Sequence, residues 1–155
     1  MGSLASTGVK NVAETGNNTA IMNEVEDLIN DGDADQFLQA PFEDFAPRTS
    51  AVLMEIEVSS NYSLLSLLSM IAPSPDWMIA VNSINLRDEN GWKDEIIIDL
   101  FPYDAGTDSG TGYTSANQMT NPVQPITSLV NVSPFNDKPI GTLTISFNET
   151  LSTTT

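Results

Sequence analysis

The chain of 155 residues contains no cysteine and no histidine. Disulfides, thiol nucleophiles, thiolate or imidazole metal sites and the commonest general base near neutral pH are therefore excluded. Basic residues are scarce: five Lys and Arg stand against 21 Asp and Glu, a formal net charge of −16. This charge repels phosphate backbones and anionic membranes, so we expect no nucleic-acid binding and no strong membrane binding. Any metal site must be built from oxygen atoms, which suits hard ions such as calcium, magnesium or manganese.

Long hydrophobic runs are also missing. The first ten residues, MGSLASTGVK, lack the apolar stretch of a secretory signal, and no later segment has the length and hydropathy of a membrane span. Apolar residues still make up 40% of the chain, which is enough for a single packed core. We expect one domain over residues 1–150 and a short tail over residues 151–155.

The hydrophobic pattern changes from helical to strand-like along the chain. Apolar residues recur at helical spacing from Ser6 to about Ile29, with an interruption at residues 15–18. This pattern predicts one or two short helices, and Asn18 or Thr19 is the expected cap of the second helix. Residues 30–50 are acidic and proline-containing and predict a long loop. Punctuated apolar segments then favour a mainly β protein, an antiparallel sandwich. The predicted strands are residues 51–60, 61–71, 77–86, 92–101, 126–132 and 140–147.

The segment PYDAGTDSG at residues 102–110 places Asp104 and Asp108 in one loop with two glycines. Glycine lets the backbone curl so that both carboxylates can point inward. Calcium takes six to eight oxygen ligands, so carbonyls of residues 105–107, waters and another segment must contribute. Asp76 in APSPDW is the expected third carboxylate, because the two loops can meet at one end of a sandwich of hairpins. The pattern predicts a calcium site at these three residues; ordinary Asx turns in polar loops are the alternative.

A second acidic segment, DGDAD at Asp31–Asp35, copies the opening of an EF-hand loop. Position six of that loop is Gln36 where the sharp turn needs glycine, and position twelve is Phe42 where a bidentate glutamate is needed. We therefore interpret this segment as a solvated acidic loop.

Aromatic residues adjoin two of the predicted ligands. Trp77 and Tyr103 can be core anchors or can form the rim of a ligand site, where an aromatic ring stacks on a sugar. Paired carboxylates also raise the alternative of a carbohydrate-binding or hydrolytic domain of a secreted enzyme. A hydrolase needs one acid with a raised pKa, whereas a polar, exposed, glycine-rich loop favours ionisation of every carboxylate. We therefore predict no enzymatic activity.

Five segments together resemble the spondin N-terminal domain, the family of F-spondin and mindin. They are ASTGVKNVAETG (5–16), SMIAPSPDW (69–77), the Gly91–Trp92 pair, DLFPYDAGTDSG (99–110) and PIGTLTI (139–145). The resemblance implies an eight-stranded β-sandwich similar to C2-type calcium-dependent membrane-binding domains, used for extracellular adhesion or matrix attachment. It also implies a calcium ion held by three aspartates, which fall on Asp76, Asp104 and Asp108.

The chain departs from the family pattern in three ways. It lacks the cysteines that animal members carry before the Gly-Trp pair, it is one residue shorter there, and it begins almost at the Ala-Ser-x-Gly-Val segment, without the strand that precedes it in the family. An unfilled sheet edge would invite pairing with a partner. A cysteine-free composition suits a bacterial secreted member better than an animal matrix protein. The resemblance thus predicts a secreted attachment module that binds Ca²⁺ and whose partners are extracellular matrix or cell-surface proteins or glycans.

Overall fold

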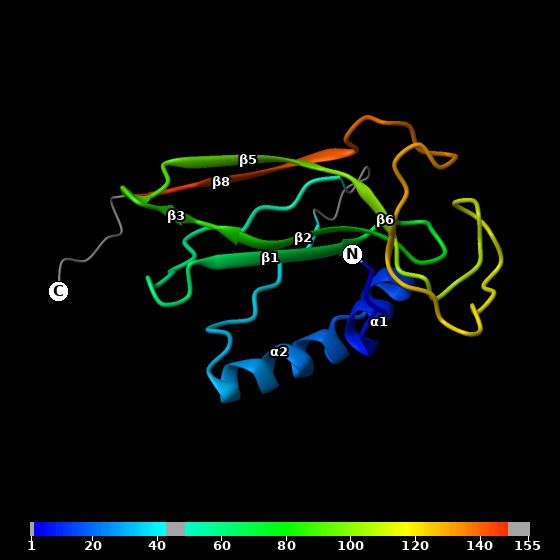
Figure 1. Ribbon diagram of the computed structural model, residues 1–155, viewed down its shortest axis with the longest axis horizontal. Helices are drawn as coiled ribbons and strands as arrows, with labels where there is room; N and C mark the ends of the chain where they lie inside the picture. The colour runs from blue at the N-terminus through cyan, green and yellow to red at the C-terminus, as the bar shows by residue number, and fades with distance from the viewer. Residues whose placement is uncertain (1, 43–48, 149–155) are drawn as a thin grey trace.

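The computed structural model describes residues 2–42 and 49–148. The tail predicted for residues 151–155 lies outside the described residues. The fold is mainly β, with antiparallel sheets and two short helices. Figure 1 shows strands β5 and β8 as one layer, strands β1 and β2 as a second layer, and the two helices on the outer side of the second layer. In the part of the chain that the structure describes, neither helix has the length and hydropathy needed to cross a membrane.

The prediction of one or two short helices is confirmed, and the structure has two, with the break at the predicted interruption. Helix α1 spans Thr7–Thr15 and helix α2 spans Thr19–Asp31. Ser6 caps α1 by accepting a hydrogen bond from the backbone N–H of Val9, and both helices end at a glycine in the left-handed conformation. The cap of α2 differs from the prediction. Asn18 occupies the N-cap position without a side-chain cap bond, and the N–H of Thr19 donates instead to Asn17 Oδ1.

The helices are held together at Gly8, where a Cβ atom would lie 2.6 Å from the Cα of Ile21. Glu24 of α2 also reaches across to the beginning of α1. Its Oε1 accepts the N–H of Gly8 at 2.7 Å and its Oε2 accepts the hydroxyl of Ser6 at 2.6 Å. A carboxylate at this position interacts favourably with the positive end of the helix dipole. Helix α1 then packs against β1 and β2 and buries Ala13 completely.

Over residues 2–42 and 49–148 the fold has ten elements, and the strand pairs found there are antiparallel. The four-stranded sheet has the order β1-β2-β6-β7, the strands β5 and β8 form a second sheet, and β3 and β4 form a hairpin. The strand bounds are Leu64–Met70 for β1, Trp77–Asn85 for β2, Arg87–Asp88 for β3, Gly91–Trp92 for β4, Glu95–Leu100 for β5, Pro102–Asp104 for β6, Thr127–Ser128 for β7 and Gly141–Ser146 for β8.

The chain changes sheets at Phe101, between β5 in the small sheet and β6 in the large one. Along β5, Ile96 and Ile98 are half-buried while Ile97 is 62% exposed, the alternation expected of a strand with one covered face. The buried core cluster consists of Ala13, Met78 and Ala105, and partly buried apolar side chains pack around it. The sheet change is what carries the chain from β5 to Asp104, beside β2.

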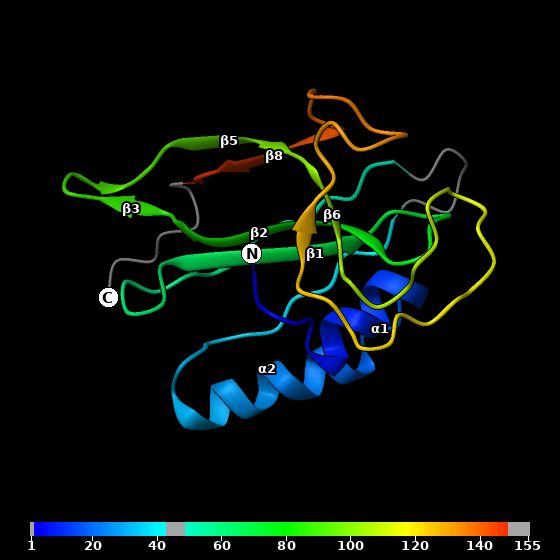
Figure 2. The same ribbon diagram turned by 45° about the vertical axis from the view of Figure 1, so that its right-hand side comes forward.

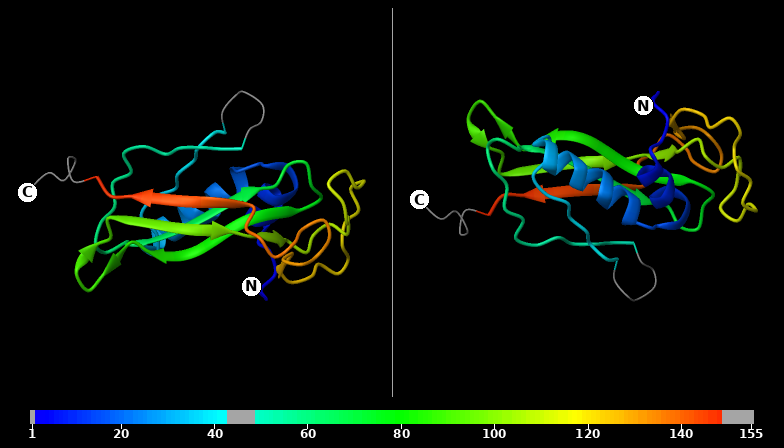
Figure 3. Two further views of the ribbon diagram at one scale, coloured as in Figure 1. Left: turned by 90° about the horizontal axis from the view of Figure 1, so that it is seen from above. Right: turned by 90° about the horizontal axis from the view of Figure 1, so that it is seen from below.

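The strand predicted for residues 51–60 is wrong. Residues 49–58 belong to no helix or strand, Glu55 has a φ of 59°, and Val52 and Met54 are 72% and 77% exposed. Views from above and below show this segment running along one side of β8 (Figure 3). The strand predicted for residues 126–132 shortens to Thr127–Ser128, and the short strands β3 and β6 were not predicted as separate elements. The other predicted strands are found with shifted ends.

Candidate metal centre

The predicted ligand loops meet because β2 pairs with β6. Trp77 lies opposite Asp104 in this antiparallel register, so Asp76, one residue before β2, lies beside the end of β6. The N–H of Ala105 donates to the carbonyl oxygen of Asp76 at 3.2 Å. Strand pairing thus brings Asp76, Asp104 and Asp108 to one end of the sandwich, although the first two are 28 positions apart in the sequence.

Asp76 is completely buried, with 0% of its surface exposed. Its Oδ2 accepts three hydrogen bonds, from the N–H of Thr107 at 2.7 Å, the hydroxyl of Thr107 at 3.2 Å and the N–H of Asp108 at 3.0 Å. Its Oδ1 is buried and has no hydrogen-bond partner among the residues that the structure describes. A buried carboxylate oxygen without a partner is costly and unusual in a folded protein.

The other two carboxylates hold the loop through backbone hydrogen bonds. Asp104 is half-buried and its Oδ1 accepts the N–H of Gly106 at 2.7 Å. Asp108 is only 4% exposed; its Oδ1 accepts the N–H of Gly110 at 2.8 Å and its Oδ2 accepts the N–H of Gln118 at 2.8 Å. Two of these bonds span two residues and are the Asx turns expected of aspartate in a glycine-rich loop. The alternative of Asx turns is therefore confirmed for Asp104 and Asp108.

Burial raises the pKa of Asp104 above its ordinary value, and the negative charges of Asp76 and Asp108 raise it further, against the lowering effect of the Gly106 N–H. The expectation of an exposed loop in which nothing raises an acid's pKa was therefore wrong. Among the described residues an ion pair joins Lys10 to Glu14, and it involves none of these three aspartates. Three acidic groups, two buried and one half-buried, thus share a site in which N–H and O–H dipoles of the described residues oppose their charge.

In this structure the three carboxylates do not have the geometry of a metal site. Within residues 2–42 and 49–148 no three acidic side chains are grouped closely enough to hold an ion. The carbonyl groups of the turn, which were expected to contribute, are partly engaged: Gly106 O accepts the N–H of Gln124 and Thr107 O accepts the N–H of Thr120, each at 2.9 Å. A carbonyl oxygen has two lone pairs, so one bond leaves it able to contact a cation.

Glycine is required at two positions of the site loop. Gly106 has a φ of 76°, and a Cβ atom there would lie 2.1 Å from the carbonyl oxygen of Gln124. At Gly110 a Cβ atom would lie 2.6 Å from Pro75 Cγ. The loop therefore packs with its backbone directly against residues 124–125 on one side and against the Asp76 loop on the other.

Trp77 is 1% exposed and cannot form the rim of a ligand site, which corrects one of the two roles considered for it. Its ring makes edge-to-face contacts with Tyr113 and Phe135, with centroids 5.2 and 5.1 Å apart. Tyr103, the other rim candidate, is half-buried and packs against the core cluster. Trp77 is thus the anchor on which the two long loops after β6 and β7 rest.

A small pocket of about 130 Å³ adjoins the site. Asp108 forms part of its wall together with oxygen-bearing side chains from α1 and the neighbouring loops, and the full lining is Glu14, Thr15, Ser74, Pro75, Asp108, Ser115 and Asn117. The pocket therefore adjoins the site on the side of Asp108, while Asp76 and Asp104 are not part of its wall.

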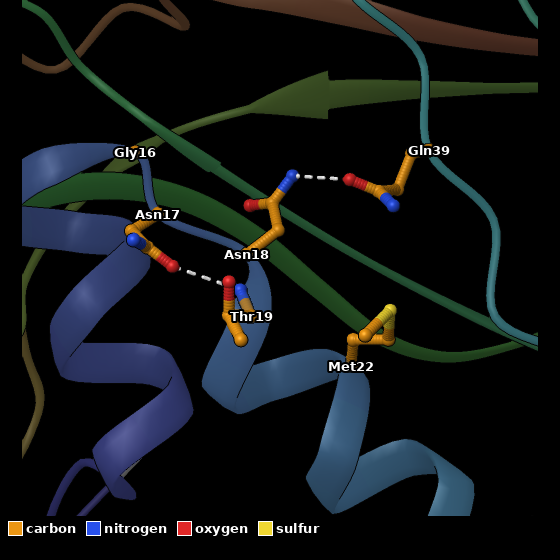
Figure 4. A pocket seen from close by; sticks show the side chains of 6 residues that line it. All are labelled: Gly16, Asn17, Asn18, Thr19, Met22 and Gln39. Atoms are coloured by element: carbon orange, nitrogen blue, oxygen red, sulfur yellow. Dashed lines mark hydrogen bonds between the residues drawn. The ribbon is translucent and has the colours of Figure 1, made fainter.

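A larger pocket of about 370 Å³ lies at the junction of the two helices (Figure 4). It is lined by uncharged side chains, and two of its contacts are internal: Asn18 Nδ2 donates to Gln39 Oε1 at 2.9 Å, and the Thr19 N–H donates to Asn17. The DGDAD segment lies at the other end of α2, where Asp31, Asp33 and Asp35 are solvent-exposed, as expected of a solvated acidic loop. Neither region contains the predicted ligands.

Sequence reasoning missed two residues that shape the site. Thr107 donates both its N–H and its hydroxyl to Asp76, and Gln118, far along the next loop, donates its N–H to Asp108. The position of Thr107 between the two aspartates of DAGTDSG was a usable signal. The role of Gln118 depends on the fold of residues 109–125 and has no local sequence signal.

Comparisons with known proteins agree with this motif. The Spondin_N family model matches residues 1–140. Spondin-2 of Homo sapiens is 39% identical over 133 residues, 83% of this chain and 39% of that protein; Spondin-1 of Rattus norvegicus is 36% identical over 150 residues, 92% of this chain and 19% of that protein. The chain therefore belongs to the spondin N-terminal domain family. It spans about two fifths or less of the length of these relatives.

Proposed function

We propose that the chain is a non-enzymatic, calcium-binding extracellular attachment module. The observation that carries this proposal is the orphaned Oδ1 of Asp76, a buried carboxylate oxygen to which no described residue donates, in a site shared with Asp104 and Asp108. A protein donor for this atom would be expected if the site were purely structural. A cation would supply the missing partner.

A bound cation would also oppose the charge of the site. The pKa of Asp104 is raised because burial and two neighbouring carboxylates disfavour its ionised form. A divalent ion is the largest local charge in such a site and reverses this effect by favouring ionised carboxylates. The residues that would hold it are Asp76 through Oδ1, Asp104 and Asp108, whose carboxylate oxygens keep free lone pairs beside their backbone bonds.

Calcium fits this donor set better than other ions. The chain has neither cysteine nor histidine, so soft and borderline metals lack their preferred ligands. Magnesium demands near-ideal octahedral geometry, whereas calcium accepts irregular sets of carboxylates, carbonyls and waters. When bound, calcium would supply charge neutralisation, a link between the Asp76 loop and residues 104–110, and an open position for a partner's oxygen atom.

The attachment role rests on family membership together with this site. The net charge of −16 opposes direct contact with anionic glycans or membranes. A calcium ion with an open coordination position could instead bridge to a carboxylate or sulfate of an extracellular matrix or cell-surface partner. Hydrolysis is disfavoured, even though the pKa of Asp104 is raised, because Asp76 is fully buried and no substrate atom can reach it as the structure stands.

Calorimetric titration with calcium, and thermal melting in calcium and in chelator, test the ion. Calcium at about 100-fold above its dissociation constant should stabilise the native state by roughly 2.7 kcal/mol. Asp108→Asn should abolish the heat of binding and the shift in melting temperature. Asp99→Asn removes the same charge from the exposed face of β5 and should leave both unchanged. A wild-type midpoint that is identical in calcium and chelator would remove the calcium proposal.

An array of matrix proteins and glycans, probed in calcium and in chelator, tests the attachment role. We expect binding that requires calcium and is lost in Asp108→Asn. Equal binding in both buffers would mean that attachment uses another face. A panel of glycosides and esters tests the absence of catalysis, and turnover that Asp104→Asn abolishes but chelator leaves intact would favour the hydrolytic alternative.

A further inference from the structure

The two oxygen atoms of the Asp76 carboxylate have unequal surroundings. Figure 2 shows the chain after β6 passing beside the loop that joins β1 to β2, and this is where Thr107 and Asp108 meet Asp76. Oδ2 accepts three hydrogen bonds, from the N–H of Thr107 at 2.7 Å, its hydroxyl at 3.2 Å and the N–H of Asp108 at 3.0 Å. Oδ1 is buried and accepts none from the described residues. An ionised carboxylate has about four lone-pair sites on its two oxygens, so Oδ2 is fully used and Oδ1 keeps its own.

Thr107 supplies two of the three donors to Oδ2 and is itself 1% exposed. Among the described residues its hydroxyl is the one side-chain group that donates to any of the three aspartates, because the other bonds come from backbone N–H groups. Its backbone is held as well, since its carbonyl oxygen accepts the N–H of Thr120 at 2.9 Å. A substitution can therefore remove this hydroxyl while both backbone donors to Oδ2 remain.

These hydrogen bonds fix the direction in which Oδ1 faces. A rotation of the carboxylate about the Cβ–Cγ bond would carry Oδ2 away from its three donors. The backbone of Asp76 is also attached to the loop, because the N–H of Ala105 donates to its carbonyl oxygen at 3.2 Å. In metal sites, groups that hydrogen-bond to a ligating carboxylate orient it, and their removal lowers metal affinity by about 10- to 100-fold.

We propose that Thr107 is a positioning residue of the cation site, whose hydroxyl holds the Asp76 carboxylate with Oδ1 directed at the ion. This inference rests on the proposed function, because it requires that a cation binds there. Thr107 acts through Asp76 and does not touch the ion. A carboxylate that is already oriented in the empty site loses less conformational freedom when the ion binds, which raises the affinity. If Thr107 only held the loop together, its hydroxyl would affect stability and leave the calcium affinity unchanged.

Calorimetric titration of the whole chain with calcium chloride tests this role. Thr107→Val replaces the hydroxyl with a methyl group, and its calcium dissociation constant should be about 10- to 100-fold higher than that of the wild type. Thr107→Ser keeps a hydroxyl and should bind calcium nearly as tightly as the wild type. Thr107→Ala removes the hydroxyl without placing a methyl group against the carboxylate, so it tests the same point if Thr107→Val folds poorly. Thr144→Val, at an exposed position of β8, is the matched control and should leave the dissociation constant unchanged.

Thermal melting of each variant in chelator separates positioning from loop stability. A melting temperature that falls in chelator while Thr107→Val and Thr107→Ala keep the wild-type dissociation constant would overturn the proposal, because Thr107 would then only stabilise the loop. Equal weakening of calcium binding by Thr107→Ser and Thr107→Val would also overturn it, since the hydroxyl would not be the responsible group. A wild-type chain that binds no calcium would remove the proposed function and this inference together. Wild-type binding that loss of the hydroxyl leaves intact would remove this inference alone.

Discussion

Trp77 and Asp104 face each other across the antiparallel pair of β2 and β6. This register places the buried Asp76 against the loop that follows Asp104, where the N–H groups of Thr107 and Asp108 donate to it. The same register places the Trp77 ring under Tyr113 and Phe135. One strand pair thus fixes both the carboxylate site and the aromatic contacts that hold the long loops after β6 and β7. The consequences are testable one residue at a time.

Asp76→Ala should destabilise the chain even in the presence of chelator. The substitution removes the acceptor for the N–H groups of Thr107 and Asp108, both of which are buried. Each unsatisfied buried donor costs about 1–3 kcal/mol, so the free energy of unfolding should fall by about 2–6 kcal/mol. Urea denaturation in chelator measures it. Asp99→Ala on β5 is the control, and an equal loss in both variants would contradict a specific role for Asp76.

Gly106→Ala should be more damaging than Gly32→Ala. Both glycines have left-handed backbones, with φ of 76° and 82°, so both substitutions carry a strain of roughly 1–2 kcal/mol. A Cβ atom at Gly32 would meet nothing within 4 Å, whereas one at Gly106 would lie 2.1 Å from Gln124 O. Thermal melting of the two variants isolates the clash. Equal shifts in melting temperature would show that the loop moves away from residues 124–125 at no cost.

The sequence predicted those parts of the fold that depend on local patterns. Helical spacing and the Thr15–Asn18 interruption predicted α1 and α2, because the glycine stop and the polar start are local signals. The alternating segment at residues 51–60 failed for a tertiary reason. The alternation of apolar and polar residues indicates which side chains would face a core, but a strand also needs a neighbouring strand with which to exchange hydrogen bonds. In addition, the backbone of Glu55 has a positive φ.

The site was predicted in part. Proline, glycine and aspartate in two loops indicated which carboxylates would meet, because one intervening strand returns the chain to the same end. Burial could not be inferred, since it comes from Tyr113 and Phe135 covering Trp77 and from residues 118–124 closing over the loop. Asp76 Oδ1 is buried, and burial raises the pKa of Asp104. Both effects are properties of packing that local sequence does not express.

Glu24→Ala should loosen the contact between α1 and α2. The substitution removes the acceptor for the Gly8 N–H and the Ser6 hydroxyl, and it removes a negative charge from the start of α1. We expect a loss of about 1–2 kcal/mol in the free energy of unfolding, the size of a lost helix cap. Chemical denaturation followed by circular dichroism measures it. Glu26→Ala, also on α2, should cost less; a loss as large as that of Glu24→Ala would mean that helix propensity, rather than the link to α1, is responsible.

Asp104→Asn should have opposite effects on stability with and without calcium. The folded-state pKa of Asp104 is raised above its value in the unfolded chain, because burial and then the charges of Asp76 and Asp108 disfavour ionisation. The stability that this group contributes is therefore full below the unfolded-chain pKa and is lost as the pH rises through the folded-state pKa. In chelator, the melting temperature of the variant should increasingly exceed that of the wild type as the pH is raised from about 3.5 to 7. In calcium at neutral pH the order should reverse, because the ion favours the ionised carboxylate that the variant lacks.

Asp99→Asn reports the general effect of removing one negative charge from this acidic chain. A difference between Asp104→Asn and wild type that stays constant across the pH range in chelator would contradict the desolvated environment assigned to Asp104.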